Sequence, residues 1–453
     1  MAKVLLINPP SETLGPENLR ITNVLYPPPP GGIALVAACL EQAGHKVTIE
    51  DLVIAPRSEK DLLDAIATTG VDAVGFSVLG PAFYATRQMM RSIRTRFSKI
   101  RLFAGNALPS EFPEWFLNEV PECDAVIVGE GEATTVELIE NNFASGTAGA
   151  MLQGDESFRP RPQLHDLDAL PFPAWHLLPY RQYRASPQLL MRSEPTLGII
   201  QSRGCPFSCG FCAQNFAWKK VRKRSVESVA DEIARNARDL DIHHFGLYDS
   251  IFPLEKDYGE KLYHALEHRN LLGRVRFFCE TRVDMVWPST FEWLQKAGLH
   301  LTFLGIESPK ENLLAQLDKK SPEVTIRKAV NTLREAGIRT YGLFMIGLPG
   351  ETAVDREALG RFSRSLSLDV ASFGIYSQYA GSPGVRSNPE IRPEDLLDGN
   401  WQMDGELGRA QKDLMRSFYL RPSLIARHLW QRDIKMDRMF KGFLQLLPAL
   451  PAR

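Results

Sequence analysis

The first part of the chain, residues 1–145, alternates short apolar runs with segments whose apolar residues recur at helical spacing. The apolar runs are almost continuous, which is typical of strands that are covered on both faces of a sheet. Two of the helical segments, 31–44 and 59–70, end on glycine, the residue that most often terminates a helix. This alternation predicts a doubly wound parallel sheet with crossover helices. The predicted strands are 3–8, 46–52, 73–78, 101–105 and 123–129.

Ligands of such sheets bind beyond the carboxyl ends of the strands. Residues Asn8, Ser77, Gly105 and Gly129 therefore mark the expected rim of a binding pocket. The loop after the first strand reads NPPSETLG and lacks a G-x-G-x-x-G turn, so the sequence disfavours a nicotinamide cofactor.

A second domain follows a change in character. Residues 146–195 are proline-rich, show no sustained period and predict a linker. The alternation then resumes over 196–385, where six β/α units favour a partial barrel over a full eight-unit barrel. Residues 386–453 contain no strand pattern and are expected to be helical. The strands predicted for the second domain are 197–203, 243–250, 276–282, 300–307, 339–347 and 370–379.

The composition narrows the class of protein. With 453 residues the chain is too long for a single hydrophobic core. The 53 basic and 54 acidic residues leave no net field that would recruit nucleic acid. The amino-terminal apolar run VLLIN is too short for a signal peptide or a membrane span, so we expect a cytoplasmic protein. Cys39, Cys123 and Cys279 stand singly among apolar residues and are expected to be packed free thiols.

The other three cysteines are crowded together. Cys205, Cys209 and Cys212 form a Cys-x3-Cys-x2-Cys pattern just after the first strand of the second domain, where the active-site loops of a barrel emerge. Three thiolates can bind three irons of a [4Fe–4S] cluster and leave the fourth iron open to another ligand. A structural zinc site would need a fourth protein ligand. His243 and His244 are far along the chain, in a predicted strand, and do not offer one.

This pattern resembles the signature of the radical S-adenosylmethionine (radical SAM) superfamily, with Phe211 at its aromatic position. The resemblance implies that the open iron chelates the amino and carboxylate groups of S-adenosylmethionine. YDSIF stands where many relatives carry Asp-Asp-x-Phe, which leaves Asp249 as its polar contact because Ser250 replaces the second acid. LGIES and FMIGLPGET resemble the fourth- and fifth-strand motifs. The cofactor contacts implied by these two motifs are Glu307, Ser308 and Gly347.

Two further residues of the third barrel strand, Glu280 and Arg282, admit two interpretations. They could contact the cofactor, or they could form a salt bridge with each other inside the barrel. The sequence does not decide between these roles.

The amino-terminal domain resembles the cobalamin-binding domain that precedes a class of radical SAM enzymes. The segments that carry this resemblance are YPPPPGGIALVAACLEQAGHKVTIEDL, FSVLG and VIVGEGEAT. It implies corrin contacts at Ser77, Gly105, Gly129, Glu130 and Gly131. Residues 8–19 contain no histidine, so no imidazole from this loop is expected to ligate cobalt, and AGNA at 104–107 replaces the usual Gly-Gly-x-His.

The carboxy-terminal segment is basic and partly amphipathic. Between residues 409 and 441 it carries nine Lys or Arg and three Asp. One interpretation is a surface helix that touches lipid. The favoured one is a cap over the open side of the barrel, with a solvated basic face. The apolar residues of the candidate lipid-facing stripe are Met439, Phe440, Phe443, Leu444 and Leu447.

Taken together, the two resemblances imply a cobalamin-dependent radical SAM C-methyltransferase. Its cofactors would be a [4Fe–4S] cluster, S-adenosylmethionine and cobalamin. Its partners would be a small-molecule or natural-product substrate and an external flavodoxin- or ferredoxin-like electron donor, with no nucleic acid. An oxidative cyclase or ring-rearranging enzyme of the same architecture is the alternative, and a cobalamin- or metal-binding sensor is the non-enzymatic one.

Overall fold

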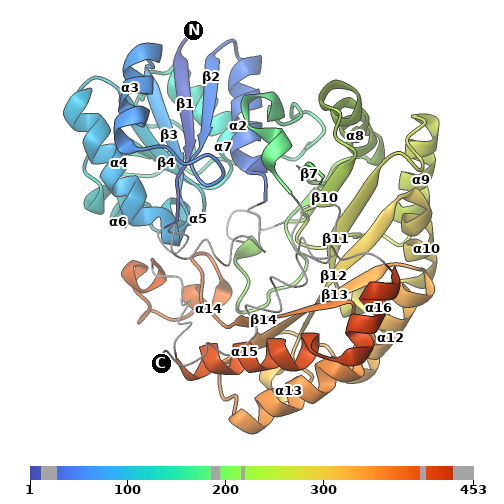
Figure 1. Cartoon of the computed structure of the whole chain (residues 1–453). Coiled ribbons are helices and arrows are strands. Elements are labelled where there is room, and N and C mark those ends of the chain that lie inside the picture. The colour runs from blue at the N-terminus through green and yellow to red at the C-terminus, as the bar shows by residue number, and fades with distance from the viewer. Residues whose placement is uncertain (12–27, 185–193, 216–219, 398–404, 432–453) are drawn as a thin grey trace, which may run out of the picture.

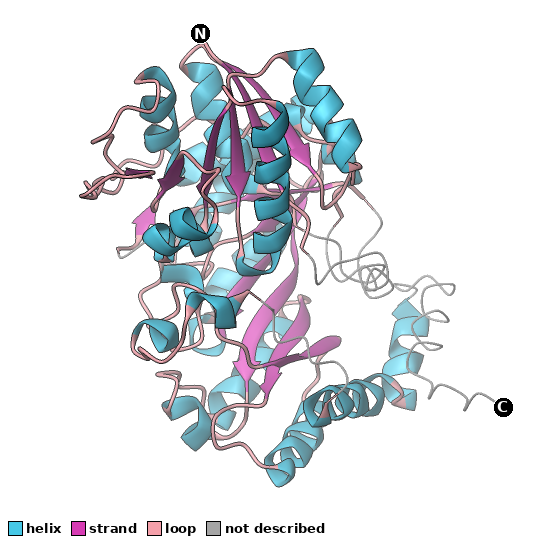
Figure 2. Ribbon diagram, turned by 90° about the vertical axis from the view of Figure 1, so that its left-hand side faces the viewer, coloured by secondary structure: helices cyan, strands magenta, loops and turns pink. Residues whose placement is uncertain are grey.

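The computed structural model describes residues 1–11, 28–184, 194–215, 220–397 and 405–431. Within these ranges two six-stranded sheets lie one beyond the other, each covered by helices (Figure 1). Figure 2 shows them as separate layers, the amino-terminal sheet above and the second sheet below.

The amino-terminal sheet has the strand order β2-β1-β3-β4-β5-β6. Strands β1 to β5 run parallel, which confirms the predicted doubly wound sheet. The residues of β1 alternate between two helical layers: Val4 and Leu6 pack with α2 and α7, whereas Leu5 and Ile7 pack with α3 and α4. The strands are β1 (Lys3–Asn8), β2 (Lys46–Asp51), β3 (Ala73–Ser77), β4 (Arg101–Gly105), β5 (Ala125–Ile127) and β6 (Ala150–Leu152). The helices are α2 (Gly31–Gln42), α3 (Glu59–Thr69), α4 (Phe83–Arg96), α5 (Ala107–Glu111), α6 (Pro113–Glu119) and α7 (Gly131–Glu140).

One strand of this sheet was not expected. Strand β6 pairs antiparallel with β5 and lies inside the segment 146–195 that the sequence assigns to a linker. Its residues AML are too few to show a period, which is why the pattern misses it.

The second sheet has the order β14-β13-β12-β11-β10-β7, and all its pairs are parallel. The two edge strands do not pair with each other, so the barrel is partial, as predicted. Its strands are β7 (Thr196–Ile199), β10 (His244–Leu247), β11 (Arg276–Arg282), β12 (Leu299–Glu307), β13 (Arg339–Ile346) and β14 (Val370–Ile375). Its helices are α8 (Val226–Leu240), α9 (Tyr258–His268), α10 (Pro288–Ala297), α11 (Glu311–Ala315), α12 (Glu323–Glu335) and α13 (Ala353–Ser365).

The first predicted barrel strand, 197–203, is divided in two. Its first half is β7, and its second half leaves the barrel as β8 (Ser202–Arg203), which pairs antiparallel with β9 (Arg222–Lys223). The segment that carries the cysteine triplet therefore begins and ends on a two-stranded ribbon.

The carboxy-terminal part covers both domains. Helix α14 (Pro383–Arg386) and the turn Pro393–Leu396 return to the amino-terminal domain, where Arg386 forms a bidentate ion pair with Glu111 and Trp115 Nε1 donates to Glu394. Helix α15 (Glu406–Tyr419) instead packs against the edge strand β14 and against α13 (Figure 1), and α16 (Pro422–Gln431) follows it. This arrangement fits the cap interpretation. The candidate lipid-facing stripe lies outside the described residues.

None of the described helices is long and apolar enough to cross a membrane.

A pair of histidines lies at the amino ends of the barrel strands. His244 opens β10, and its Nδ1 lies 2.7 Å from Thr196 Oγ1 while its Nε2 lies 2.9 Å from Nε2 of His300. Burial, helped by the charge of Arg276, lowers the pKa of His244 to about 3. Burial also lowers the pKa of His300 well below its usual value, and the neighbouring His244 adds to that shift.

These histidines predict a loss of stability in mild acid. An unfolded histidine titrates near pH 6.5, so the unfolded chain gains protons below that pH while the folded pair stays neutral. Stability is therefore fully present above about pH 6.5 and falls below it by roughly 1.4 kcal/mol per pH unit for each such proton. Replacing His300 with glutamine should flatten the fall in the free energy of unfolding between pH 7 and pH 5, measured by urea denaturation. Equal slopes for the variant and the wild type would contradict this.

Candidate active site

The cysteine loop is tightly closed at its base. Gly204 has φ +88°, and a Cβ atom there would lie 2.6 Å from the carbonyl oxygen of Lys220, so only glycine fits. Further along the loop, Gly210 N donates to Leu317 O at 2.9 Å and Gly210 O accepts from Gly384 N at 2.9 Å. The loop is thus fixed by the segment after α11 on one side and by α14 on the other.

The three cysteines of the loop form no disulfide and are half-buried. Burial raises the pKa of Cys205 and raises that of Cys212 to about 11, with Cys209 adding to both shifts. Among the described residues, no group of three or more His, Cys, Asp or Glu side chains converges on a point where one metal ion could sit. In a [4Fe–4S] cluster each thiolate ligand binds a separate iron, so its cysteines need not converge on one metal ion.

A cationic side chain lies against the thiols. Arg282 at the end of β11 donates to Cys209 Sγ at 3.6 Å, stacks 3.8 Å from the ring centre of Phe207 and forms a bidentate pair with Asp284 at 2.9 and 3.0 Å. The possible salt bridge between Arg282 and Glu280 does not form, because Asp284, two residues on in the chain, takes the guanidinium.

The position of Arg282 predicts an effect on the potential of a bound cluster. The positive charge of Arg282 stabilises the reduced cluster, which carries one more negative charge than the oxidised cluster. The Arg282→Met variant should therefore keep its iron, while the reduction potential of the cluster falls by on the order of tens of millivolts. Redox titration followed by electron paramagnetic resonance (EPR) measures this shift, and Arg282→Lys is the matched control that keeps the charge. A potential that is unchanged in the methionine variant would contradict the expectation.

Two carboxyl groups face the interior of the barrel. The side chain of Glu280 is exposed, although protein atoms surround it on all sides at a greater distance. It therefore faces an open space inside the barrel. Burial, with the nearby charge of Glu307, raises the pKa of Glu280 to about 7. Glu307 is buried and is paired at 2.5 Å with Lys319 Nζ, which also donates to Gly305 O at 3.2 Å. Lys319 was not predicted.

The remaining residues implied by the radical SAM motifs shape the backbone around this space. Glu307 has φ +61° and follows an irregularity in the β12–β13 pairing. The next residue, Ser308, accepts from Lys310 N at 3.2 Å. Gly347 has φ +75° and donates its N–H to Glu351. Phe211 packs against a leucine cluster made of Leu313, Leu314, Leu317 and Leu348.

Asp249 braces the start of the cysteine loop. Its carboxylate accepts from Gln201 N at 3.2 Å and from the N–H and hydroxyl groups of Ser202, the hydroxyl at 2.7 Å. Burial raises the pKa of Asp249 to about 6. The structure thus gives this predicted cofactor contact a supporting role behind the loop.

The predicted rim of the amino-terminal sheet comes together. Ser77 and Gly105 lie side by side in register at the ends of β3 and β4, and Asn106 Nδ2 donates to Ser77 Oγ at 3.0 Å. Gly129, with φ +84°, donates to Ser110 Oγ at 3.1 Å. The rim also exposes an apolar side chain, since Leu79 is 51% exposed.

Two of the implied corrin contacts have other partners. The Glu130 carboxylate is held by Arg203 and Arg222, and a Cβ on Gly131 would lie 3.3 Å from Val36 of α2. The carboxyl end of the amino-terminal sheet therefore lies beside the ribbon that holds the cysteine loop. Nothing in the sequence marked Arg203 or Arg222.

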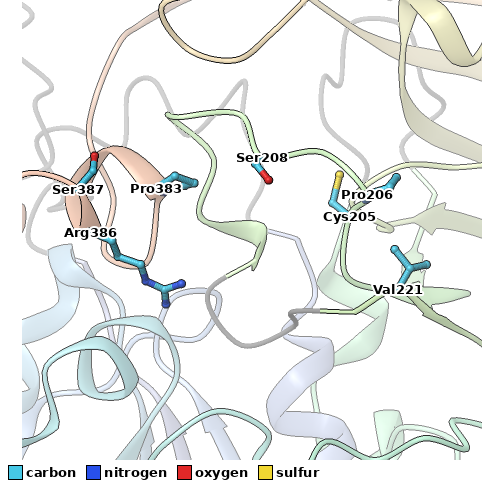
Figure 3. A pocket seen from close by; sticks show the side chains of 7 residues that line it. All are labelled: Cys205, Pro206, Ser208, Val221, Pro383, Arg386 and Ser387. Carbon is cyan, nitrogen blue, oxygen red and sulfur yellow. The ribbon is translucent and has the colours of Figure 1, made fainter.

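A cavity of about 640 Å³ opens beside the cysteine loop (Figure 3). It lies between the loop, the start of β9 and helix α14. Its walls are formed by Cys205, Pro206, Ser208, Val221, Pro383, Arg386 and Ser387.

Comparison with known families accounts for this arrangement. A model described as "B12 binding domain" matches residues 18–139, and one described as "Radical SAM superfamily" matches residues 199–362. The chain is a B12-binding radical SAM protein. Its two domains confirm the expected cofactors, which are cobalamin, a [4Fe–4S] cluster and S-adenosylmethionine.

The relatives of this B12-binding radical SAM protein are named for different activities. An uncharacterized methyltransferase, PH0819, from Pyrococcus horikoshii is 27% identical over 98% of both chains. An anaerobic magnesium-protoporphyrin IX monomethyl ester cyclase from Rubrivivax gelatinosus is 27% identical over 78% of this chain and 64% of its own. The radical SAM methyltransferase TsrM from Kitasatospora setae, solved with cobalamin and a [4Fe–4S] cluster, shares the fold with a TM-score of 0.68, 20% identity and coverage of 85% and 74% of the two chains.

Proposed function

We propose that this protein is a cobalamin-dependent radical SAM methyltransferase that acts on an unactivated carbon of a small molecule. One observation carries the proposal: the carboxyl rim of the B12-binding domain lies beside the base of the cysteine loop, joined to it by Glu130, Arg203 and Arg222. A methyl group and a substrate radical can combine only where both cofactors reach one substrate.

Each part of the site then has a defined task. Cys205, Cys209 and Cys212 would hold the cluster, with Arg282 balancing its charge and Asp249 fixing the start of the loop. Cleavage of S-adenosylmethionine and a transferable methyl group are the chemistry that the bound cofactors supply.

The open space in the barrel would hold S-adenosylmethionine. Glu280 faces this space and can accept a hydrogen bond from the amino group of the methionine part. Glu307, Ser308 and Gly347 would line the rest of that molecule, and the Glu307–Lys319 pair keeps the bulged end of β12 in place.

The rim of the amino-terminal sheet would hold cobalamin. Ser77 and Gly105 offer a small, flat surface for the corrin at the ends of β3 and β4, and Gly129 continues it. With no histidine in residues 8–19, this loop supplies no imidazole for cobalt.

The substrate side of the proposal rests on size and redox state. A cavity of about 640 Å³ matches the sites that small molecules occupy in proteins. The six cysteines form no disulfide, which fits a reducing cytoplasm, where an external flavodoxin- or ferredoxin-like protein would deliver electrons.

Labelled S-adenosylmethionine tests the proposal. The anaerobically reconstituted, reduced protein should release 5′-deoxyadenosine and, from S-adenosylmethionine with a CD₃ group, transfer the label to a product in extracts of the source cells. The cyclase alternative, which the cyclase relative favours, gives 5′-deoxyadenosine without a labelled product. A sensor gives neither, and either of these results would overturn the proposal.

A further inference from the structure

A buried cluster of four charged residues joins the two domains at the base of the cysteine loop. We call Glu130, Glu132, Arg203 and Arg222 the interdomain ion cluster. Arg203 Nη1 donates to Glu130 Oε1 at 2.7 Å, and its Nη2 donates to Glu132 Oε1 at 2.5 Å. Arg222 donates to both oxygens of Glu130, at 2.9 and 3.0 Å. The side chains are 6 to 11% exposed, so water screens them little.

The two arginines of the cluster lie on the ribbon that closes the cysteine loop. Arg203 and Arg222 are paired in register across the β8–β9 ribbon, one just before and one just after the segment that carries the cysteines. Two like charges opposite each other on a ribbon repel. The carboxylates of Glu130 and Glu132 offset that repulsion, so the amino-terminal domain stabilises the base of the loop.

The two glutamates come from the edge that faces the corrin. Glu130 precedes the first residue of α7 and Glu132 lies in its first turn, where the helix dipole favours negative charge. Gly129, the neighbour of Glu130, belongs to the predicted corrin rim and is fixed by Ser110. One short segment, 129–132, therefore contacts both the proposed cobalamin site and the ribbon that holds the cysteine loop.

We propose that the interdomain ion cluster positions the two cofactors, setting the distance and orientation between cobalt and the iron–sulfur cluster. Glu130, Glu132, Arg203 and Arg222 are positioning residues in this account and take no part in the reaction. The inference rests on the proposed function, since it presupposes that both cofactors serve one substrate.

Two variants separate positioning from simple stabilisation. Arg203→Met leaves Glu132 buried without its partner, which is strongly destabilising. Arg203→Met/Glu132→Met removes both partners and leaves Glu130 with Arg222, and an apolar replacement of a buried ion pair of this kind often restores stability. If the ion pairs position the two domains, the double variant regains its melting temperature but not the fixed distance between the two cofactors.

Pulsed dipolar EPR of the reduced holoprotein measures the distance between Co(II) and the cluster. The wild type should show one narrow distance distribution, and both variants a broader one at unchanged iron and cobalamin content. In the protein without cofactors, amide hydrogen exchange over residues 202–212 should be about tenfold or more faster in Arg203→Met.

Arg161→Met is the matched control, because Arg161 pairs with Glu137 on the same helix α7 but does not touch the cysteine loop. It should leave both readouts unchanged. A narrow wild-type distribution in both cluster variants would overturn the inference, as would broadening in the single variant that disappears in the apolar double variant. Failure of the proposed function is distinct from these outcomes, because it appears already in the wild type, as a missing Co(II) signal or as no labelled product.

Discussion

Replacing any one of Cys205, Cys209 and Cys212 with alanine is expected to remove the iron–sulfur cluster and abolish cleavage of S-adenosylmethionine. Each thiolate would bind a different iron, so no neighbouring ligand can compensate for its loss. Iron content, visible absorbance and 5′-deoxyadenosine formation should all fall to background.

Cys123→Ala and Cys279→Ala are the controls for this prediction. Both thiols are buried, and burial raises the pKa of each to about 12, so they behave as packed apolar side chains. Their replacement should cost some stability and leave the iron content intact. Full iron content in all three triplet variants, or its loss in either control, would show that the ligands have been wrongly assigned.

Replacing Gly105 with tryptophan is expected to weaken cobalamin binding about tenfold to a hundredfold while the iron–sulfur absorbance stays unchanged. Gly105 ends β4 on the rim beside Ser77. Because glycine has no side chain, the proposed corrin surface is open at this position. An indole there fills the space of the corrin, whereas the cluster lies in the other domain. Titration of the apoprotein with hydroxocobalamin measures the affinity.

Gly105→Ala separates this steric effect from damage to the fold. A Cβ at this position would lie 3.6 Å from Ile127 Cβ, an ordinary contact, and Gly105 is not among the residues with positive φ. The alanine variant should therefore bind cobalamin nearly as well as the wild type. Equal affinities of the tryptophan variant and the wild type would exclude Gly105 from the corrin site.

The sequence predicts best those elements whose own residues form a clear pattern of apolar and polar positions. The bounds of β1, β4 and β11 match the predicted strands, because each contains a run of consecutive apolar residues. Helix α3 ends where Gly70 adopts a left-handed conformation, as its glycine implied. The antiparallel edge strand β6 and the β8–β9 ribbon were missed because two or three residues carry no period.

Spacing along the chain predicts the cysteine triplet as a candidate site, whereas contacts between residues that lie apart in the sequence could not be predicted. Lys319 lies 12 residues after Glu307, and no motif connects them, yet they form a buried pair. Glu130 belongs to a segment that resembles a corrin motif, but its carboxylate is held by guanidinium groups of the other domain. The first pairing depends on how the barrel folds and the second on how the two domains meet, and no local sequence pattern contains either.

The return of residues 383–397 to the amino-terminal domain has a consequence for how such proteins can be recombined. Arg386 and Glu394 bind that domain through Glu111 and Trp115 after the chain has completed the barrel, so the polypeptide encircles the junction. A chimera that exchanges only residues 1–145 would lack the matching segment 383–397. A functional exchange of cobalamin modules between enzymes of this kind should therefore transplant the two separate pieces together, and modules of this family are expected to be inherited as such a pair.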